Sequence, residues 1–349
     1  ASLVGSLAVG GAREPELDPH GLLTPFYDSW SLDFWILSDE GGSLFPSRLG
    51  SVHQHWEGDP QGPVITRAGT SGKVLESSVF TESTEPNAGA LRVNLKARGQ
   101  PGDRLAVSVR PYNPEGIQFV EHIAADAAGM HLEIDHEARV SFGEAPGELA
   151  LSEYHQGDAL HQLGSESAER SIKCEAGMAS AVAAWRLGDD GEKALELTLP
   201  PRPSPESAPR TLSLPTGSES PLAPWAAPEP AYAHLNRTAT GTLDMLTQTE
   251  AYPGPFTYRR FWYRDAYFLL QALLSQGHFD RVQRHLSGFF RRQKANGYFQ
   301  SQEGEWDSNG QVLAIFQRYC QYSRRTLTDE SLRHLERGAR WITRKRLGP

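Results

Sequence analysis

The sequence predicts a protein of two parts, an antiparallel β-sandwich followed by helical hairpins. Three observations support this fold class. Apolar residues alternate with a period of two in the first two hundred residues, they recur at helical spacing from about residue 231, and a proline-rich stretch lies between these regions. The length of 349 residues agrees with two or three domains.

Residues 1–199 are expected to form the β-sandwich. Period-two alternation is clearest in three segments, marked by Leu91, Val93 and Leu95, by Leu105, Val107 and Val109, and by Leu195, Leu197 and Leu199. Turn-forming residues separate such segments, as in Arg98–Asp103. Many short strands without a long helical pattern favour a large antiparallel sandwich.

Residues 200–230 are expected to form a linker. This stretch holds 10 of the 24 prolines of the chain. Proline lacks a backbone N–H and fixes φ, so such a density blocks helices and central strands. An extended connector follows from this composition.

Residues 231–349 are expected to form about five helices. The stripes that define them are Leu235, Ala239, Leu243 and Leu246; Ala266, Leu269, Leu270, Leu273 and Leu274; Phe279, Val282, Leu286, Phe289 and Phe290; Val312, Ile315, Phe316 and Tyr319; and Leu332, Leu335, Ala339 and Ile342. Gln276-Gly277 and Asn296-Gly297 end the second and third helices. We therefore expect antiparallel helical hairpins with functional loops between them.

Composition excludes several classes of protein. The chain is 38% hydrophobic and 22% charged, as in folded globular proteins, and no apolar stretch approaches the ~20 residues of a membrane span. Cys174 and Cys320 are the only cysteines, which excludes a disulfide framework. His53 and His55 share a strand face but lack a third ligand, so we expect neither metal nor cofactor. The compartment stays open, with the cytoplasm favoured.

Charge is distributed unevenly along the chain. The net charge is −9, but residues 1–231 carry 16 Lys and Arg against 33 Asp and Glu, whereas residues 232–349 carry 18 against 10. The overall balance argues against nucleic acid as a partner. The asymmetry fits either an acidic domain docked on a basic one or a basic part of a larger domain.

The first candidate motif is Phe261-Trp262-Tyr263-Arg264-Asp265, at the start of the second predicted helix. An indole offers a stacking surface for the apolar face of a sugar. Arg264 supplies donors and Asp265 supplies acceptors, a combination that recognises a vicinal diol. The alternative is an Arg–Asp pair that caps the helix beside core aromatics.

The second candidate motif is Glu303-Gly304-Glu305-Trp306-Asp307-Ser308-Asn309-Gly310, a loop that leads into the fourth predicted helix. A carboxyl group placed against an aromatic wall has a raised pKa, because desolvation disfavours its charged form. A protonated carboxyl is what a general acid requires. The alternative is an acidic surface turn in which Asp307 caps the helix.

The order of these motifs resembles the catalytic region of the six-hairpin glycoside hydrolases, a clan with an (α/α)6 barrel that includes glucoamylases, debranching α-glucosidases and glucosylglycerate hydrolases. The resemblance implies that Trp262, Arg264, Asp265 and Trp306 bind substrate. It places the general acid on Asp307, with Glu305 second. The Asp departs from the Trp-Glu pair of glucoamylases. Many members carry a β-sandwich before the barrel, and Val109–Gly116 is similar to a segment of such sandwiches.

The resemblance implies an inverting hydrolase of α-linked, glucosyl glycosides that needs neither cofactor nor metal. Inversion requires a second carboxylate as base, ~6.5–9.5 Å from the acid. In the clan that base lies on a late hairpin of a barrel with twelve helices. We therefore expect the chain to be one part of a longer enzyme, or to be completed by a partner chain that supplies the rest of the barrel.

Two other functions stay open. A glycoside phosphorylase of related fold would use phosphate in place of water. A carbohydrate-binding or scaffold protein would keep the sandwich and part of a barrel without catalysis. An oligosaccharide or small glycoside is the expected ligand in each case.

Overall fold

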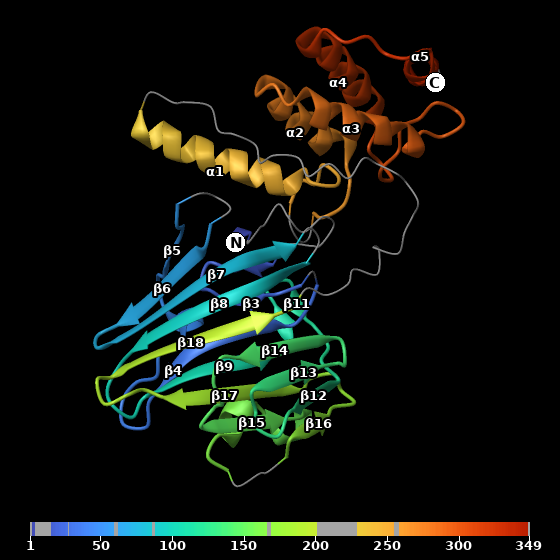
Figure 1. Ribbon diagram of the computed structural model, residues 1–349. Coiled ribbons are helices and arrows are strands. Elements are labelled where there is room, and N and C mark those ends of the chain that lie inside the picture. Colours follow the sequence, from blue (N-terminus) through green and yellow to red (C-terminus); the bar gives the residue numbers. More distant parts are fainter. Residues whose placement is uncertain are drawn as a thin grey trace. The chain divides into compact units, whose positions relative to one another are not determined.

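The computed structural model forms two compact units, Ala1–Glu219 and Ser220–Pro349, which are described separately (Figure 1). The residues that the structure describes are 2–3, 15–26, 28–58, 62–85, 88–165, 169–200, 229–254 and 258–347. The proline-rich linker expected at residues 200–230 lies almost wholly outside them.

The first unit contains two large antiparallel sheets. The seven-stranded sheet has, in spatial order, β1 (Ser2–Leu3), β2 (Glu16–Leu17), β3 (Leu23–Thr24), β4 (Ser31–Leu37), β9 (Arg104–Arg110), β17 (Ser180–Arg186) and β15 (Glu148–Ser152). The nine-stranded sheet has β16 (Ser171–Lys173), β12 (His122–Ala125), β13 (His131–Ile134), β14 (Ala138–Phe142), β18 (Glu192–Leu199), β8 (Ala88–Arg98), β7 (Lys73–Glu85), β6 (Val64–Thr70) and β5 (His53–Trp56). A small hairpin joins β10 (Tyr112–Asn113) to β11 (Gly116–Ile117).

One hydrophobic core lies between the two sheets. Leu32 and Phe34 of β4 and Val107 of β9 belong to it, together with Val93 of β8 and Leu197 of β18 in the other sheet. The three alternating segments predicted from the sequence coincide with β8, β9 and β18, and their apolar residues are buried. The expected antiparallel β architecture is therefore confirmed, because alternation places every second side chain on the core face.

The outer face of the seven-stranded sheet is also covered. Trp35 of β4, Ala106 of β9 and Val182 of β17 form a second, smaller cluster with Ala159. Ala159 belongs to a short 3-10 helix, Ala159–Gln162, which packs on this face. The sheet also buries polar side chains, including the carboxyl group of Asp33, which is 5% exposed.

Burial raises the pKa of Asp33 to about 6, from an ordinary value of 3.8. The folded state therefore binds more protons than the unfolded state between these pH values, so stability falls as pH rises through this window and is level above it. We expect Asp33→Asn to remove this dependence and to raise the unfolding free energy at pH 7 by up to about 3 kcal/mol. The amide oxygen keeps the acceptor for the Phe34 backbone N–H, 2.9 Å from Asp33 Oδ1.

Urea unfolding of both proteins from pH 3.5 to 7.5 measures this effect. If the unfolding free energies of Asp33→Asn and the wild type changed in parallel with pH, the raised pKa of Asp33 would be contradicted.

The second unit contains five α-helices within its described residues (Figure 1). They are α1 (Pro230–Leu246), α2 (Tyr263–Ser275), α3 (Phe279–Phe289), α4 (Ser308–Ser323) and α5 (Asp329–Leu347). A 3-10 turn, Phe290–Arg292, extends α3. Among the described helices, none is long and apolar enough to span a membrane.

The core of the helical unit joins all five helices. It contains Leu243 of α1, Leu270 of α2, Leu286 of α3, Ile315 of α4 and Leu335 of α5. Most residues of the predicted stripes therefore pack in this core. A helical unit after the β-unit is confirmed. Closure into an (α/α)6 barrel stays a prediction.

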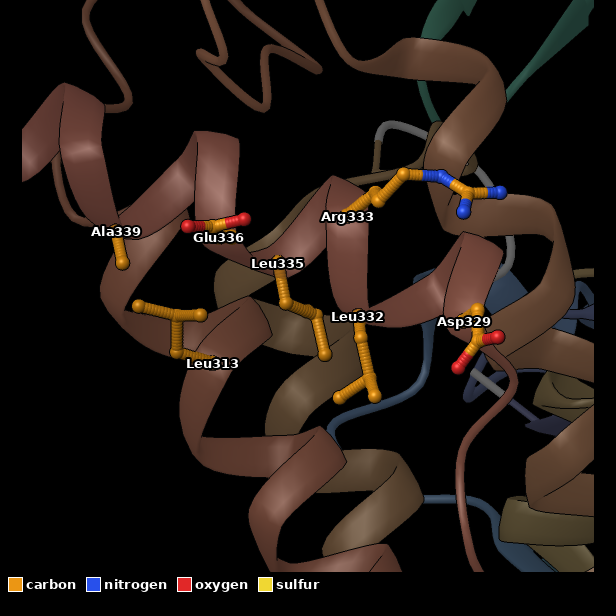
Figure 2. A pocket seen from close by; sticks show the side chains of 7 residues that line it. All are labelled: Leu313, Asp329, Leu332, Arg333, Leu335, Glu336 and Ala339. Carbon is orange, nitrogen blue, oxygen red and sulfur yellow. The ribbon is translucent and has the colours of Figure 1, made fainter.

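Four residues of the predicted stripes are exposed, namely Leu235, Ala239, Leu332 and Ala339. Leu235 is 61% exposed, because only the second half of α1 packs on the core, and Leu332 of α5 is 50% exposed. Leu332 lines a groove of about 570 Å³ between α4 and α5. Figure 2 shows Leu313, Leu332 and Leu335 pointing into this groove. The unit therefore presents apolar helix surface that these five helices do not cover.

Candidate active site

The two predicted motifs meet at a single ion pair. Nε and one terminal nitrogen of Arg264 donate to the two carboxylate oxygens of Asp307 at 2.7 and 2.8 Å. This bidentate contact joins the first turn of α2 to the residue that precedes α4. Residues 43 positions apart in sequence are thereby held at one end of the helical unit.

Glu305 fixes the loop to the start of α2. Trp262 precedes this helix and its side chain makes no capping hydrogen bond. The cap comes instead from Glu305, whose Oε1 accepts the backbone N–H of Arg264 at 2.9 Å. Its other oxygen accepts from the hydroxyl of Ser301. Since Glu305 is 1% exposed and both oxygens are engaged, its carboxylate holds the loop in place.

Asn309 fixes the other side of the loop. Its Oδ1 accepts the backbone N–H of Phe299 at 2.9 Å, and its Nδ2 donates to the carbonyls of Gly297 and Gly338. Gly297 has φ of +95° and lies against the backbone oxygen of Arg337, so no side chain fits there. The loop is therefore held at both of its ends.

Asp307 does not cap α4. It occupies the capping position, but its side chain makes no capping hydrogen bond. The interpretation of Asp307 as a helix cap is therefore wrong, because Arg264 takes both carboxylate oxygens.

The pKa of Asp307 is lowered, mainly by its hydrogen bond to Arg264. The direction is opposite to the raised pKa expected from an aromatic wall. The physical reason is that a guanidinium stabilises the charged carboxylate, and this outweighs the desolvation of the carboxyl group. The pKa of Arg264 is raised by the same contact.

Asp307 lines a cavity of about 760 Å³ among α2, α4 and α5. The cavity is lined by Tyr267, Phe268, Trp306, Asp307, Gly310, Gln311, Ala314, Trp341, Ile342, Lys345 and Arg346. Its volume matches that of small-molecule sites.

Aromatic side chains form one wall of this cavity. Trp306 is 65% exposed and stacks on Tyr298, with ring centroids 5.8 Å apart and planes 17° apart. Tyr298 also stacks on the buried Trp341 at 4.6 Å and donates its hydroxyl to the backbone oxygen of Glu305. An indole fixed from behind and open to solvent is a suitable platform for a sugar ring.

The predicted site residues divide into two groups. Trp306 and Asp307 line the cavity. Arg264 and Glu305 are not part of its lining, but Arg264 pairs with Asp307 and Glu305 accepts the backbone N–H of Arg264. Trp262 and Asp265 are absent from the lining, and the guanidinium of Arg260 lies over the ring of Trp262 at 5.7 Å. The catalytic and substrate-binding roles of all six residues stay predictions.

The sequence interpretation missed several residues of the cavity. Phe268 of α2 and Trp341 and Lys345 of α5 belong to its lining. Trp341 and Lys345 are four residues apart on one helix, a spacing that places both on the same face. Among the described residues, no group of three or more His, Cys, Asp or Glu could hold a metal ion.

Comparison with known proteins supports the fold. No protein-family model and no curated sequence matches the chain. Among solved structures, it is similar to a bacterial glucoamylase complexed with acarbose, with a TM-score of 0.66 and 13% sequence identity. The match covers 100% of this chain and 58% of the glucoamylase chain. The chain therefore has a glucoamylase-like fold and spans little more than half of that enzyme.

Proposed function

We propose that the chain forms part of a glycoside hydrolase that cleaves α-linked, glucosyl substrates with inversion. The observation that carries this proposal is a carboxylate, Asp307, at the edge of a cavity whose wall is an open indole. The glucoamylase-like fold supports it, as does the binding of acarbose by the glucoamylase of similar fold.

Asp307 would act as the general acid that protonates the leaving oxygen. In the free protein its lowered pKa keeps it ionised, so substrate must change its surroundings. Sugar hydroxyls that accept hydrogen bonds from Arg264 would draw the guanidinium away from Asp307. The freed carboxyl, closed between substrate and indole, would then regain a pKa high enough to carry a proton.

The other residues would bind and position the substrate. The open face of Trp306 would support a sugar ring, and Arg264 would hold its hydroxyls, with Trp262 and Asp265 in contact with the same subsite. Glu305 would act through Arg264, because it fixes the backbone from which that guanidinium extends. It is a positioning residue in this proposal.

We also propose that further helices complete the barrel and supply the catalytic base, from the same polypeptide or from a partner chain. The chain corresponds to 58% of the glucoamylase of similar fold. The leucine-lined groove between α4 and α5 is an apolar surface suited to another helix (Figure 2).

The function is tested by incubation of the protein, together with any helices that complete it, with maltose and larger α-glucosides. Proton NMR identifies the anomer of the glucose released. The proposal expects β-glucose as the first product without added phosphate. Product formed only with phosphate would identify a phosphorylase, and saturable binding without product would identify a carbohydrate-binding protein.

A further inference from the structure

The cavity lined by Asp307 also carries positive charge. The acidic residues of its lining do not neutralise this charge. Among the described residues that line it, Asp307 is the one acid, and Arg264 already neutralises it. Lys345 and Arg346, from the last turn of α5, line the same cavity. Within the described parts of the chain, no ion pair includes either of these two side chains.

The ammonium group of Lys345 is held close to the aromatic wall. Its Nζ lies 6.0 Å from the ring centroid of Trp306 and 5.8 Å from that of Trp341. These distances are within the range of cation–π attraction. The charge is therefore directed over the indoles that border the cavity.

We infer that this end of the cavity is a subsite for an oxyanion, a carboxylate or a phosphate, bound by Lys345 and Arg346. The inference rests on the proposed function, because it describes a second part of the same substrate site. A sugar ring on Trp306 would place a substituent near Lys345, and Arg346 lines the same cavity. Two sources of the anion are compatible with this geometry, a charged group carried by the glycoside and a free phosphate bound next to it.

Binding measurements test the inference without requiring turnover. Isothermal titration calorimetry would compare 4-carboxyphenyl α-D-glucopyranoside with 4-nitrophenyl α-D-glucopyranoside, two ligands of similar shape of which only the first is charged. A third arm would measure the nitrophenyl glycoside with and without inorganic phosphate. Each arm would use the wild type, the double variant Lys345→Met/Arg346→Gln, and Lys294→Met, an exposed lysine outside the cavity.

The wild type and Lys294→Met are expected to bind the carboxylated glycoside roughly tenfold more tightly than the neutral one, as for one charge-assisted contact. The double variant should lose this preference and keep its affinity for the neutral ligand, which also shows that it is folded. A phosphate-dependent gain lost in the double variant would identify free phosphate as the source.

Equal affinities in all wild-type arms, or a preference that survives in the double variant, would overturn the inference. If the wild type showed the anion preference but did not hydrolyse α-glucosides, only the proposed function would be contradicted.

Discussion

Replacing Asp307 with Asn is expected to lower kcat of the complete enzyme by about 10²–10⁴-fold, the usual contribution of a general acid. The amide has the size of the carboxylate but no proton to give to the leaving oxygen. Because Asn does not titrate, the pH dependence of kcat should also lose the basic limb that deprotonation of the general acid produces. The rate of release of glucose from maltose, measured from pH 4 to 8, checks both effects.

The matched control is Glu303→Gln, which removes an exposed acid from the same loop. It should leave kcat within a factor of two or so of the wild type, as for most surface changes. Circular dichroism would establish that Asp307→Asn is folded. A folded Asp307→Asn protein with unchanged kcat would remove Asp307 from the role of acid.

Replacing Asp244 with Ala is expected to destabilise the helical unit by about 3–5 kcal/mol, because it leaves the charge of Arg281 buried without its carboxylate. Arg281 of α3 donates to Asp244 of α1, and the two side chains are only 3% and 1% exposed. His285, one turn further along α3, contacts the backbone oxygen of Thr247 at 3.0 Å. The ion pair between Arg281 and Asp244 therefore fastens the end of α1 to α3 in the helical core.

Urea unfolding followed by circular dichroism at 222 nm measures this change. The double variant Asp244→Leu/Arg281→Met separates charge from packing, since replacing both ions by apolar groups of similar volume often restores stability. A loss of less than about 1 kcal/mol in Asp244→Ala would contradict a structural role for the pair.

Periodicity predicted the elements because burial acts on every second side chain of a strand and on one face of a helix. In β8, Val93 and Leu95 both enter the sandwich core, as their spacing predicts. The same logic failed for Leu235 and Leu332, which lie on helical stripes but are exposed. Periodicity shows that a face is apolar, whereas burial depends on whether another element covers it.

The site was harder to predict because its contacts join distant segments. The sequence placed Arg264 and Asp307 near one another only through the resemblance, and nothing in either motif indicates their bidentate ion pair. An aromatic neighbour suggested a raised pKa for Asp307, but a guanidinium 2.7 Å away lowers it. Lys345 enters the cavity from α5, which lies far from both motifs in the sequence.

The proposed function depends on a sugar ring that binds on the indole of Trp306, beside the carboxylate of Asp307. Titration with maltotriose, followed by intrinsic tryptophan fluorescence, tests this binding most directly because it requires no turnover. The wild type and a control, Trp56→Phe in the β-unit, should show the same saturable change, and Trp306→Ala should bind maltotriose at least about tenfold more weakly than the wild type does. Unchanged affinity in Trp306→Ala would contradict binding on this indole.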